Sequence, residues 1–423
     1  MRLPTRIALA AALVVLAACR DASGPVQRGL RSSQDLTLQS SNANIVPGQY
    51  IVVFKDGVTD PDGLAQTLVS LNGGSLKHTY KSAIKGFAAI LSDAAVAALQ
   101  AQSTIVDYIE PDEQGGPEGE TQQPPQSGGS TQPSGSTTQQ MDANGDPWGL
   151  DRIDQRALPL SGTYTYTSTG AGVHVYLIDT GIWTQHPEFG GRADNVYDVA
   201  GLGGEDCWGH GTAVAGVVGS ATYGVAKGVF LHGVRVYAQC TTDQVGIPVG
   251  VAVKSDVIAG VDWVTAHHLS PAVANLSVSL DPSTALTTAV HNLQNSGVFV
   301  TATAANHNAN ACLEAGGASG AFTVAASTKT DAKADFSNWG PCVSIYAPGQ
   351  SIKSTWLLDQ TIILSGTSLA APHVTGVAAL YKATFGDAPS NVVAAWISNN
   401  ATAGVITGNP SGTPNLLLFK SNF

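Results

Sequence analysis

The chain has 423 residues, more than one average domain requires. Charged residues make up 12% and 47 residues are glycine, a composition that favours a compact, densely packed fold over a disordered chain. The net charge of −11 predicts no attraction to nucleic acid. No uninterrupted apolar run reaches the ~18 residues that a membrane-spanning helix needs.

Residues 1–19 have the layout of an export signal. Arg2 and Arg6 precede an apolar run, and small residues lead directly into Cys19. A cysteine at this place resembles the bacterial lipoprotein signal, in which the thiol is acylated. The alternative is an ordinary secretory signal that contains a cysteine. Under either interpretation the protein is secreted from the cytoplasm, and acylation of Cys19 would give it a lipid-anchored precursor.

The other cysteines indicate disulfide bonds. Their number is even and the chain is exported, so we expect two disulfides rather than free thiols. The sequence has no Cys-x-x-Cys spacing, which argues against a structural zinc site. Three pairings are compatible with the spacing, and pairing in sequence order would close loops of about 33 and 30 residues, each worth roughly 3–4 kcal/mol. The four residues are Cys207, Cys240, Cys312 and Cys342.

A small α+β unit is predicted over residues 45–111. Apolar runs typical of strands alternate with two runs of helical period, and a further short strand is expected near His78–Tyr80. The resulting order, βαββαβ, is typical of a ferredoxin-like fold. The unit contains no cluster of catalytic residue types.

Two changes in composition divide the rest of the chain. Residues 112–142 are mostly Gly, Gln, Ser, Pro and Thr, which predicts a flexible low-complexity linker that buries too little surface to fold. In residues 143–423, apolar strands alternate with helical patterns, which predicts an α/β domain with a mostly parallel sheet covered on both faces. In such domains functional sites form at the carboxyl ends of the strands.

Three residues in this domain have the chemistry of a nucleophilic enzyme. Asp179 ends the apolar run GVHVYLIDT, where a carboxylate is costly unless a partner pairs with it. His210 lies between glycines in DCWGHGT, at the start of a helix. Ser368 opens a helix in SGTSLAAPHV, where the helix dipole favours negative charge. Each alone has a structural explanation: Asp179 could cap a turn, His210 could be a satisfied structural histidine and Ser368 could be a helix N-cap. Together, however, they follow the chain order of the subtilisin triad.

On these motifs the chain resembles the subtilisin-like serine peptidases, in particular the proteinase K and aqualysin branch. WGLDRIDQRALPL adds to the match, which extends over residues 148–423, and residues 45–111 resemble the inhibitor-type propeptide of the same family. The resemblance implies a subtilisin-like three-layer α/β fold. It also implies a monomeric, secreted, self-processing serine endopeptidase that acts on proteins and peptides, needs no cofactor for its chemistry and is inhibited by its own propeptide.

The resemblance assigns a role to each site residue. Ser368 would attack the scissile carbonyl, His210 would pass its proton to the leaving amine, and Asp179 would hold the imidazole tautomer. Asn306, in TAANHNANA, matches the residue that donates to the oxyanion together with the Ser368 N–H.

Disulfides and calcium are also implied by the family. The implied disulfide pairs are Cys207–Cys240 and Cys312–Cys342. One family calcium site has ligands that match Asp151, Asp154 and Gln155, for which the alternative is a solvated helix face. A second family site has Ser344 in place of an aspartate, and a neutral hydroxyl is a poor ligand for a hard cation.

The substrate-binding walls depart from the family pattern. The resemblance assigns one wall to Gly250, Val251 and Ala252 and the other to Ser277, Val278 and Ser279. Larger residues replace family glycines on the second wall, and Ala305 stands where a glycine usually precedes the oxyanion asparagine. We therefore expect a narrower or reshaped pocket for the substrate side chain that precedes the scissile bond.

The sequence does not decide where the propeptide is cleaved or which molecule accepts the acyl group. Cleavage of the propeptide is expected either near residues 112–118 or near Gln140–Met141. A catalytically idle binding protein on the same fold, or acyl transfer to an acceptor other than water, would also be compatible with these motifs.

Overall fold

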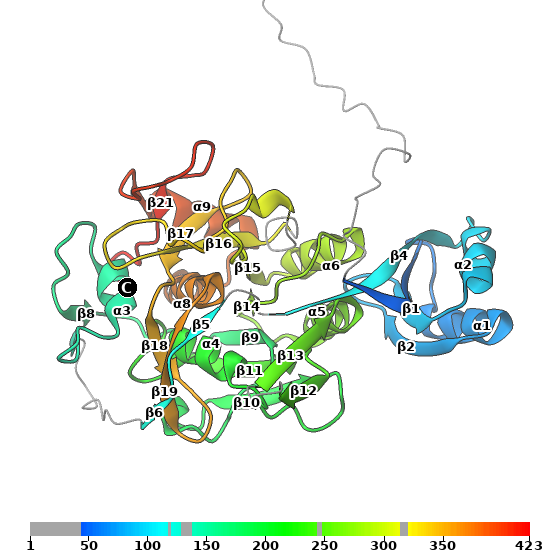
Figure 1. Ribbon diagram of the computed structural model, residues 1–423, viewed down its shortest axis with the longest axis horizontal. Coiled ribbons are helices and arrows are strands. Elements are labelled where there is room, and N and C mark those ends of the chain that lie inside the picture. The colour runs from blue at the N-terminus through cyan, green and yellow to red at the C-terminus, as the bar shows by residue number, and fades with distance from the viewer. Residues whose placement is uncertain (1–43, 117–119, 128–137, 243–247, 314–319) are drawn as a thin grey trace, which may run out of the picture. The chain divides into compact units, whose positions relative to one another are not determined.

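The computed structural model describes residues 44–116, 120–127, 138–242, 248–313 and 320–423 (Figure 1). The predicted export signal and Cys19 lie outside these ranges. Cys240 and Gly250 also belong to a stretch for which side-chain surroundings are not described. Within the described part of the chain, no helix combines the length and apolar character needed to cross a bilayer.

The N-terminal unit has the predicted βαββαβ order. Both of its helices begin at a capping side chain, because Asp60 accepts a hydrogen bond from the Gly63 N–H at 3.0 Å and Ser92 accepts one from the Ala95 N–H at 3.2 Å. The helices cover one face of the sheet. The elements are β1 (Ile45–Phe54), α1 (Pro61–Asn72), β2 (Ser75–Tyr80), β3 (Gly86–Ile90), α2 (Asp93–Gln100) and β4 (Val106–Gly115).

The sheet of this unit continues into the larger domain. Its strand order is β12-β13-β4-β1-β3-β2, where β12 spans Gln239–Thr242 and β13 spans Pro248–Val253. The end of β4 pairs antiparallel with β13, Gly115 opposite Ala252. Asp112 accepts a hydrogen bond from the Ser255 N–H at 2.9 Å, at the start of the helix that follows β13.

A nine-stranded sheet forms the centre of the larger domain. Its order is β10-β11-β9-β14-β15-β16-β17-β21-β20, and the pairs from β10 to β21 are parallel. The strands are β9 (His174–Asp179), β10 (Ala193–Asp198), β11 (Phe230–Arg235), β14 (Ala272–Leu276), β15 (Phe299–Thr303), β16 (Phe322–Ser327), β17 (Ile345–Pro348), β20 (Thr402–Ala403) and β21 (Leu416–Leu417).

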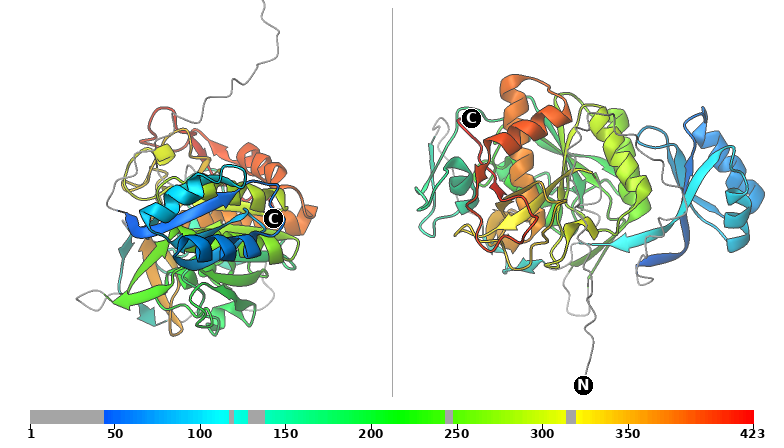
Figure 2. Two further views of the ribbon diagram at one scale, coloured as in Figure 1. Left: turned by 90° about the vertical axis from the view of Figure 1, so that its right-hand side faces the viewer. Right: turned by 90° about the horizontal axis from the view of Figure 1, so that it is seen from above.

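Helices cover both faces of this sheet, which confirms the predicted three-layer class (Figure 2). Alternate side chains of β9 enter different cores: Val175 and Leu177 pack with one set of helices, and Tyr176 and Ile178 with the other. The first set is α4 (His210–Gly219), α8 (Thr367–Phe385) and α9 (Ser390–Asn400); the second is α5 (Lys254–His267) and α6 (Thr284–Asn295). The short helix α3 (Trp148–Asp154) contributes to the first core.

Parts of the region expected to be an irregular linker form short strands. β5 (Thr121–Gln122) and β6 (Gln126–Ser127) both pair antiparallel with β19 (Gln360–Ser365), which forms a hairpin with β18 (Ile352–Thr355). β7 (Thr138–Gln140) pairs with β8 (Thr163–Thr165). The structure therefore differs from the expectation over these residues. Polar side chains did not prevent pairing, because the strand contacts are made by the backbone.

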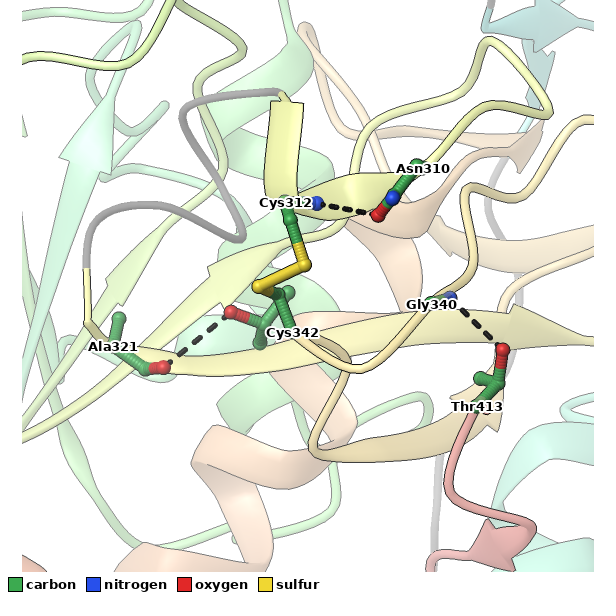
Figure 3. Close-up of a disulfide and its surroundings, with 7 residues drawn as sticks. Asn310, Cys312, Ala321, Gly340, Cys342 and Thr413 are labelled. Carbon is green, nitrogen blue, oxygen red and sulfur yellow. Dashed lines mark hydrogen bonds between the residues drawn. A yellow bond between two sulfur atoms is a disulfide. The ribbon is translucent and has the colours of Figure 1, made fainter. Parts of the chain in front are cut away.

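A disulfide joins Cys312 to Cys342, one of the two pairs that the resemblance implies (Figure 3). The loops around it are held by the Cys312 N–H, which donates to Asn310 Oδ1 at 3.0 Å, and by the Gly340 N–H, which donates to Thr413 Oγ1 at 2.9 Å. Cys207 is also disulfide-bonded.

Candidate active site

A buried aspartate–histidine pair lies at the carboxyl end of β9. Asp179 is the last residue of this strand and is fully buried, and its Oδ1 lies 2.6 Å from Nδ1 of His210, the first residue of α4. The same oxygen accepts a hydrogen bond from the Thr180 N–H at 2.7 Å. The carboxylate therefore holds the proton on Nδ1 and leaves Nε2 as the nitrogen that faces the site.

Charge rather than burial decides the protonation state of His210. Burial alone would lower its pKa, but the carboxylates of Asp179 and Glu120 outweigh burial and raise the pKa well above its ordinary value. His373 provides the contrast within the same domain. It is buried in α8 without a carboxylate and donates to the Leu369 carbonyl at 2.8 Å, and burial lowers its pKa to about 4.

The turn before His210 is held by hydrogen bonds to the buried carboxylate of Asp206. This carboxylate accepts hydrogen bonds from the Trp208 and Gly209 N–H groups at 2.9 and 2.8 Å and from the Thr212 N–H at 2.9 Å. Gly209 has a φ of 104°, and a Cβ there would lie 2.6 Å from the ring of Trp356. The glycine before the histidine is therefore required by both backbone conformation and space.

Ser368 is the second residue of α8 and is 2% exposed. Pro372, four residues later, has no N–H to bond the Ser368 carbonyl, so that carbonyl loses its usual helical partner. Ser277 supplies a replacement, because its Oγ donates to the Ser368 carbonyl at 3.2 Å. Because Pro372 leaves this carbonyl unpaired within the helix, a hydrogen bond from Ser277 links the start of α8 to a predicted substrate wall.

Asn306 follows β15 and is oriented by the residue before Ser368. Its Oδ1 accepts hydrogen bonds from the N–H of Thr367 at 2.8 Å and from the hydroxyl of Thr367 at 2.9 Å. The oxygen is engaged by donors of α8, and Nδ2 is the donor half of this amide.

Ala305 has a φ of 73°, in the left-handed region that a Cβ disfavours, and it is 1% exposed. We expect Ala305→Gly to raise the free energy of unfolding by up to about 1 kcal/mol, because the relieved strain exceeds the extra freedom of glycine in the unfolded chain. Thermal melting of the variant and the wild type measures the effect. A lower melting temperature for the glycine variant would show that Ala305 is not strained.

Glu120 connects the histidine to the start of α8. Its Oε1 lies 3.2 Å from His210 Nε2, and the same oxygen would lie 2.8 Å from a Cβ added at Gly366, two residues before Ser368. The Glu120 side chain is 3% exposed. His210 Nε2 and the N-terminus of α8 therefore face the same small space, which the carboxylate occupies.

Residues 114–116 make backbone contacts with both predicted substrate walls. On one wall, Ala252 and Val253 of β13 pair with Gly115 and Gln114. On the other, Ser279 forms an isolated antiparallel bridge with Gly116. Ser277 and Val278 are buried, whereas Val251 is 40% exposed.

The three predicted calcium ligands all have partners within the protein. Asp151 accepts hydrogen bonds from the Ser161 hydroxyl at 2.9 Å and from the Gly162 N–H at 2.7 Å. Asp154 pairs with the Lys420 ammonium group at 2.8 Å, which already supplies a positive charge. Gln155 accepts from the Ser161 N–H at 2.9 Å. Calcium binding by these residues stays a prediction, and among the described residues no group of three His, Cys, Asp or Glu side chains suited to a metal occurs.

Sequence reasoning missed the contact of Glu120 and the stacking of Trp208 on His210. Glu120 lies in a segment whose composition predicts no structure, and nothing in its neighbours marks it. Trp208 stands in the quoted motif DCWGHGT, and its place two residues before the histidine was the available signal.

An α/β fold with a buried aspartate–histidine pair beside a serine at a helix N-terminus defines the class of serine hydrolases. The sequence profile of the Subtilase family matches residues 170–416, and that of Peptidase inhibitor I9 matches residues 49–114. The chain therefore belongs to the subtilase family and is a serine endopeptidase with an inhibitor-type N-terminal unit.

Individual relatives agree with this assignment. The chain is 42% identical to the extracellular serine proteinase of Thermus sp. (strain Rt41A) over 432 residues, which cover 96% of this chain and 97% of the relative. It is 46% identical to alkaline serine exoprotease A of Vibrio alginolyticus over 277 residues, 64% of this chain and 50% of the relative. A cold-adapted subtilisin-like serine proteinase of known structure superimposes with a TM-score of 0.61 at 42% identity, over 65% of this chain and 98% of the other.

Proposed function

We propose that Asp179, His210 and Ser368 act as the catalytic triad of this endopeptidase. Ser368 Oγ attacks the scissile carbonyl while His210 Nε2 takes its proton, and His210 then gives that proton to the leaving amine. Water repeats the sequence on the acyl-enzyme. The observation that carries the proposal is the 2.6 Å pair of Asp179 and His210, which fixes the Nδ1–H tautomer. The test is replacement of Ser368, which should leave the protein uncleaved and inactive.

Two donors are proposed for the oxyanion. The backbone N–H of Ser368 lies in the first turn of α8, where it has no helical acceptor. Asn306 Nδ2 is the second, and its orientation is supported by the hydrogen bonds that Thr367 makes to the amide oxygen. Such donors stabilise charge that develops in the transition state, so they act on kcat more than on substrate binding.

Substrates are proposed to bind as an extended strand between β13 and residues 277–279. Gln114–Gly116 support this proposal, because they make backbone contacts with both walls in the way an added strand does. Backbone pairing tolerates many side chains, so it suits an enzyme that cleaves varied proteins.

Self-processing is proposed to occur between Gly116 and Glu120, which agrees with the first of the two expected regions. Gly116 forms a backbone bridge with Ser279 of one predicted substrate wall. Thr121 pairs with Ser365, which ends β19 three residues before Ser368. The second region, near residue 140, is disfavoured because Gln139 is 2% exposed and donates to the Thr222 carbonyl at 2.8 Å. N-terminal sequencing of the processed enzyme tests the placement.

Before cleavage, Glu120 is proposed to keep His210 protonated. An imidazolium cannot accept the serine proton, so the contact opposes catalysis while the segment is in place. Since Glu120 raises the pKa of His210, Glu120→Gln should lower that pKa. Self-processing of the variant should then extend to lower pH, and its rate advantage over the wild type should grow as the pH falls.

Processing rates at several pH values measure this effect on Glu120→Gln. Asp107→Asn is a matched control, because it removes an equal charge from an exposed position on β4. Equal pH profiles for the wild type and Glu120→Gln would rule out this role of Glu120.

Export is supported by the relatives, one of which is named extracellular. Secretion of the mature enzyme as a monomer, and lipid attachment of its precursor at Cys19, stay predictions. Mass analysis of the N-terminal peptide from a membrane fraction would test the lipid.

A further inference from the structure

An indole ring lies flat against the imidazole of His210. The ring centroids of Trp208 and His210 are 5.2 Å apart and the ring planes differ by 16°, which is an offset stacked arrangement. Trp208 is 6% exposed, so its ring is packed within the domain rather than placed against the histidine from solvent.

The indole is held in this place by its own surroundings. The N–H groups of Trp208 and Gly209 bind the same oxygen of Asp206, and the positive φ of Gly209 reverses the chain between the two rings. Tyr237 contributes an aromatic contact to Trp208 from another element, with ring centroids 6.4 Å apart. The ring is therefore fixed before the histidine reacts.

We infer that Trp208 is a positioning residue for His210, which holds the plane of the imidazole and stabilises its protonated form. Asp179 fixes one edge of the ring through Nδ1, but a single hydrogen bond leaves the ring free to tilt about that bond. Contact with the indole face removes this freedom. The face of an indole also carries negative potential, which attracts the imidazolium that forms in the transition state.

The charge effect has a definite sign in the processed enzyme. The titratable groups around His210 are Asp179 from β9, Glu120 from the linker, Tyr237 after β11 and Asp206 in the preceding turn. Cleavage frees the chain at Glu120, whereas Trp208 stays beside the imidazole. Loss of the indole face removes stabilisation of the imidazolium and should lower the pKa of His210. The acid limb of the pH profile of kcat/KM should therefore move to lower pH.

The test compares Trp208→Leu, which removes the π face, with Trp208→Phe, which retains one. On peptide substrates, processed Trp208→Leu should lose about tenfold or more in kcat/KM, and its acid limb should fall by about half a pH unit. Trp208→Phe should recover most of the rate and the wild-type limb. Trp148→Leu is the matched control: it removes a tryptophan that is 3% exposed and bonds the Ser351 carbonyl, and it should leave the limb unchanged.

The inference rests on the proposed role of His210, and the two can fail separately. If His210→Ala kept its activity, the triad assignment would fail. If His210→Ala were inactive but Trp208→Leu kept the wild-type limb, or shifted it upward, the positioning role alone would be overturned. Equal behaviour of the Leu and Phe variants would overturn it as well. Should Trp208→Leu not yield processed enzyme, Trp208→Met, which also lacks a π face, takes its place in the comparison with Trp208→Phe.

Discussion

Replacement of Ser368 by alanine is expected to leave the full chain uncleaved and to lower kcat by about 10⁶-fold, the size of the effect in subtilisin. The serine hydroxyl is the proposed nucleophile, and no other group could form the acyl-enzyme on this route. Intact mass and N-terminal sequencing of the purified protein measure processing, and added peptides measure residual hydrolysis.

The matched control for this replacement is Ser390→Ala. Ser390 is also a serine in the first turn of a helix, but it lies in α9, away from the aspartate–histidine pair. This variant should be processed like the wild type. If Ser368→Ala were processed at the wild-type rate in purified form, with no other protease present, Ser368 would not be the nucleophile.

Asn306→Asp is expected to lower kcat by at least about 100-fold with little change in KM. Aspartate has nearly the shape of asparagine and keeps an oxygen that can accept from the Thr367 N–H and hydroxyl. The Nδ2 donor is replaced by a second oxygen, whose charge repels the oxyanion. The substitution thus separates donation to the transition state from the structural role of the amide.

Steady-state kinetics on peptides and thermal melting together test this expectation. Asn308→Gly is the control in the same loop, because Asn308 has a φ of 50°, which glycine accepts, and its side chain bonds Lys333. Asn306→Asp should melt close to the wild type while losing activity. A variant that kept its kcat would remove Asn306 from the oxyanion site.

The fold and the candidate catalytic residues could be predicted because their signals are local. Apolar runs such as those of β9 and β15 mark buried parallel strands, and the motifs around Asp179, His210 and Ser368 each lie at the end of an element. Asp179 ends a strand and His210 and Ser368 open helices, and their chain order, which is that of the subtilisin triad, allowed the separate motifs to be placed in one site.

The pairing of the linker could not be predicted from its sequence. Thr121–Gln122 and Gln126–Ser127 have polar side chains, and their contacts with β19 are made by backbone groups that every residue carries. Composition reports how much side-chain surface a segment can bury, not whether a neighbouring strand edge is open to it.

The role of Pro372 was out of reach for a similar reason. The sequence shows that a proline follows Ser368 in the first turns of a helix, but not which group replaces the missing donor. The replacement, Ser277, is 91 residues away along the chain. Contacts of this kind depend on how β14 and α8 pack, and that packing is a property of the whole domain.

Labelling with a sulfonyl fluoride tests the central claim most directly. The processed enzyme would be inactivated with phenylmethylsulfonyl fluoride, digested and mapped by mass spectrometry. The predicted result is one modified residue, Ser368, with label and activity changing in proportion. Stoichiometric label on a different residue, or full activity with Ser368 modified, would contradict the assignment of the nucleophile.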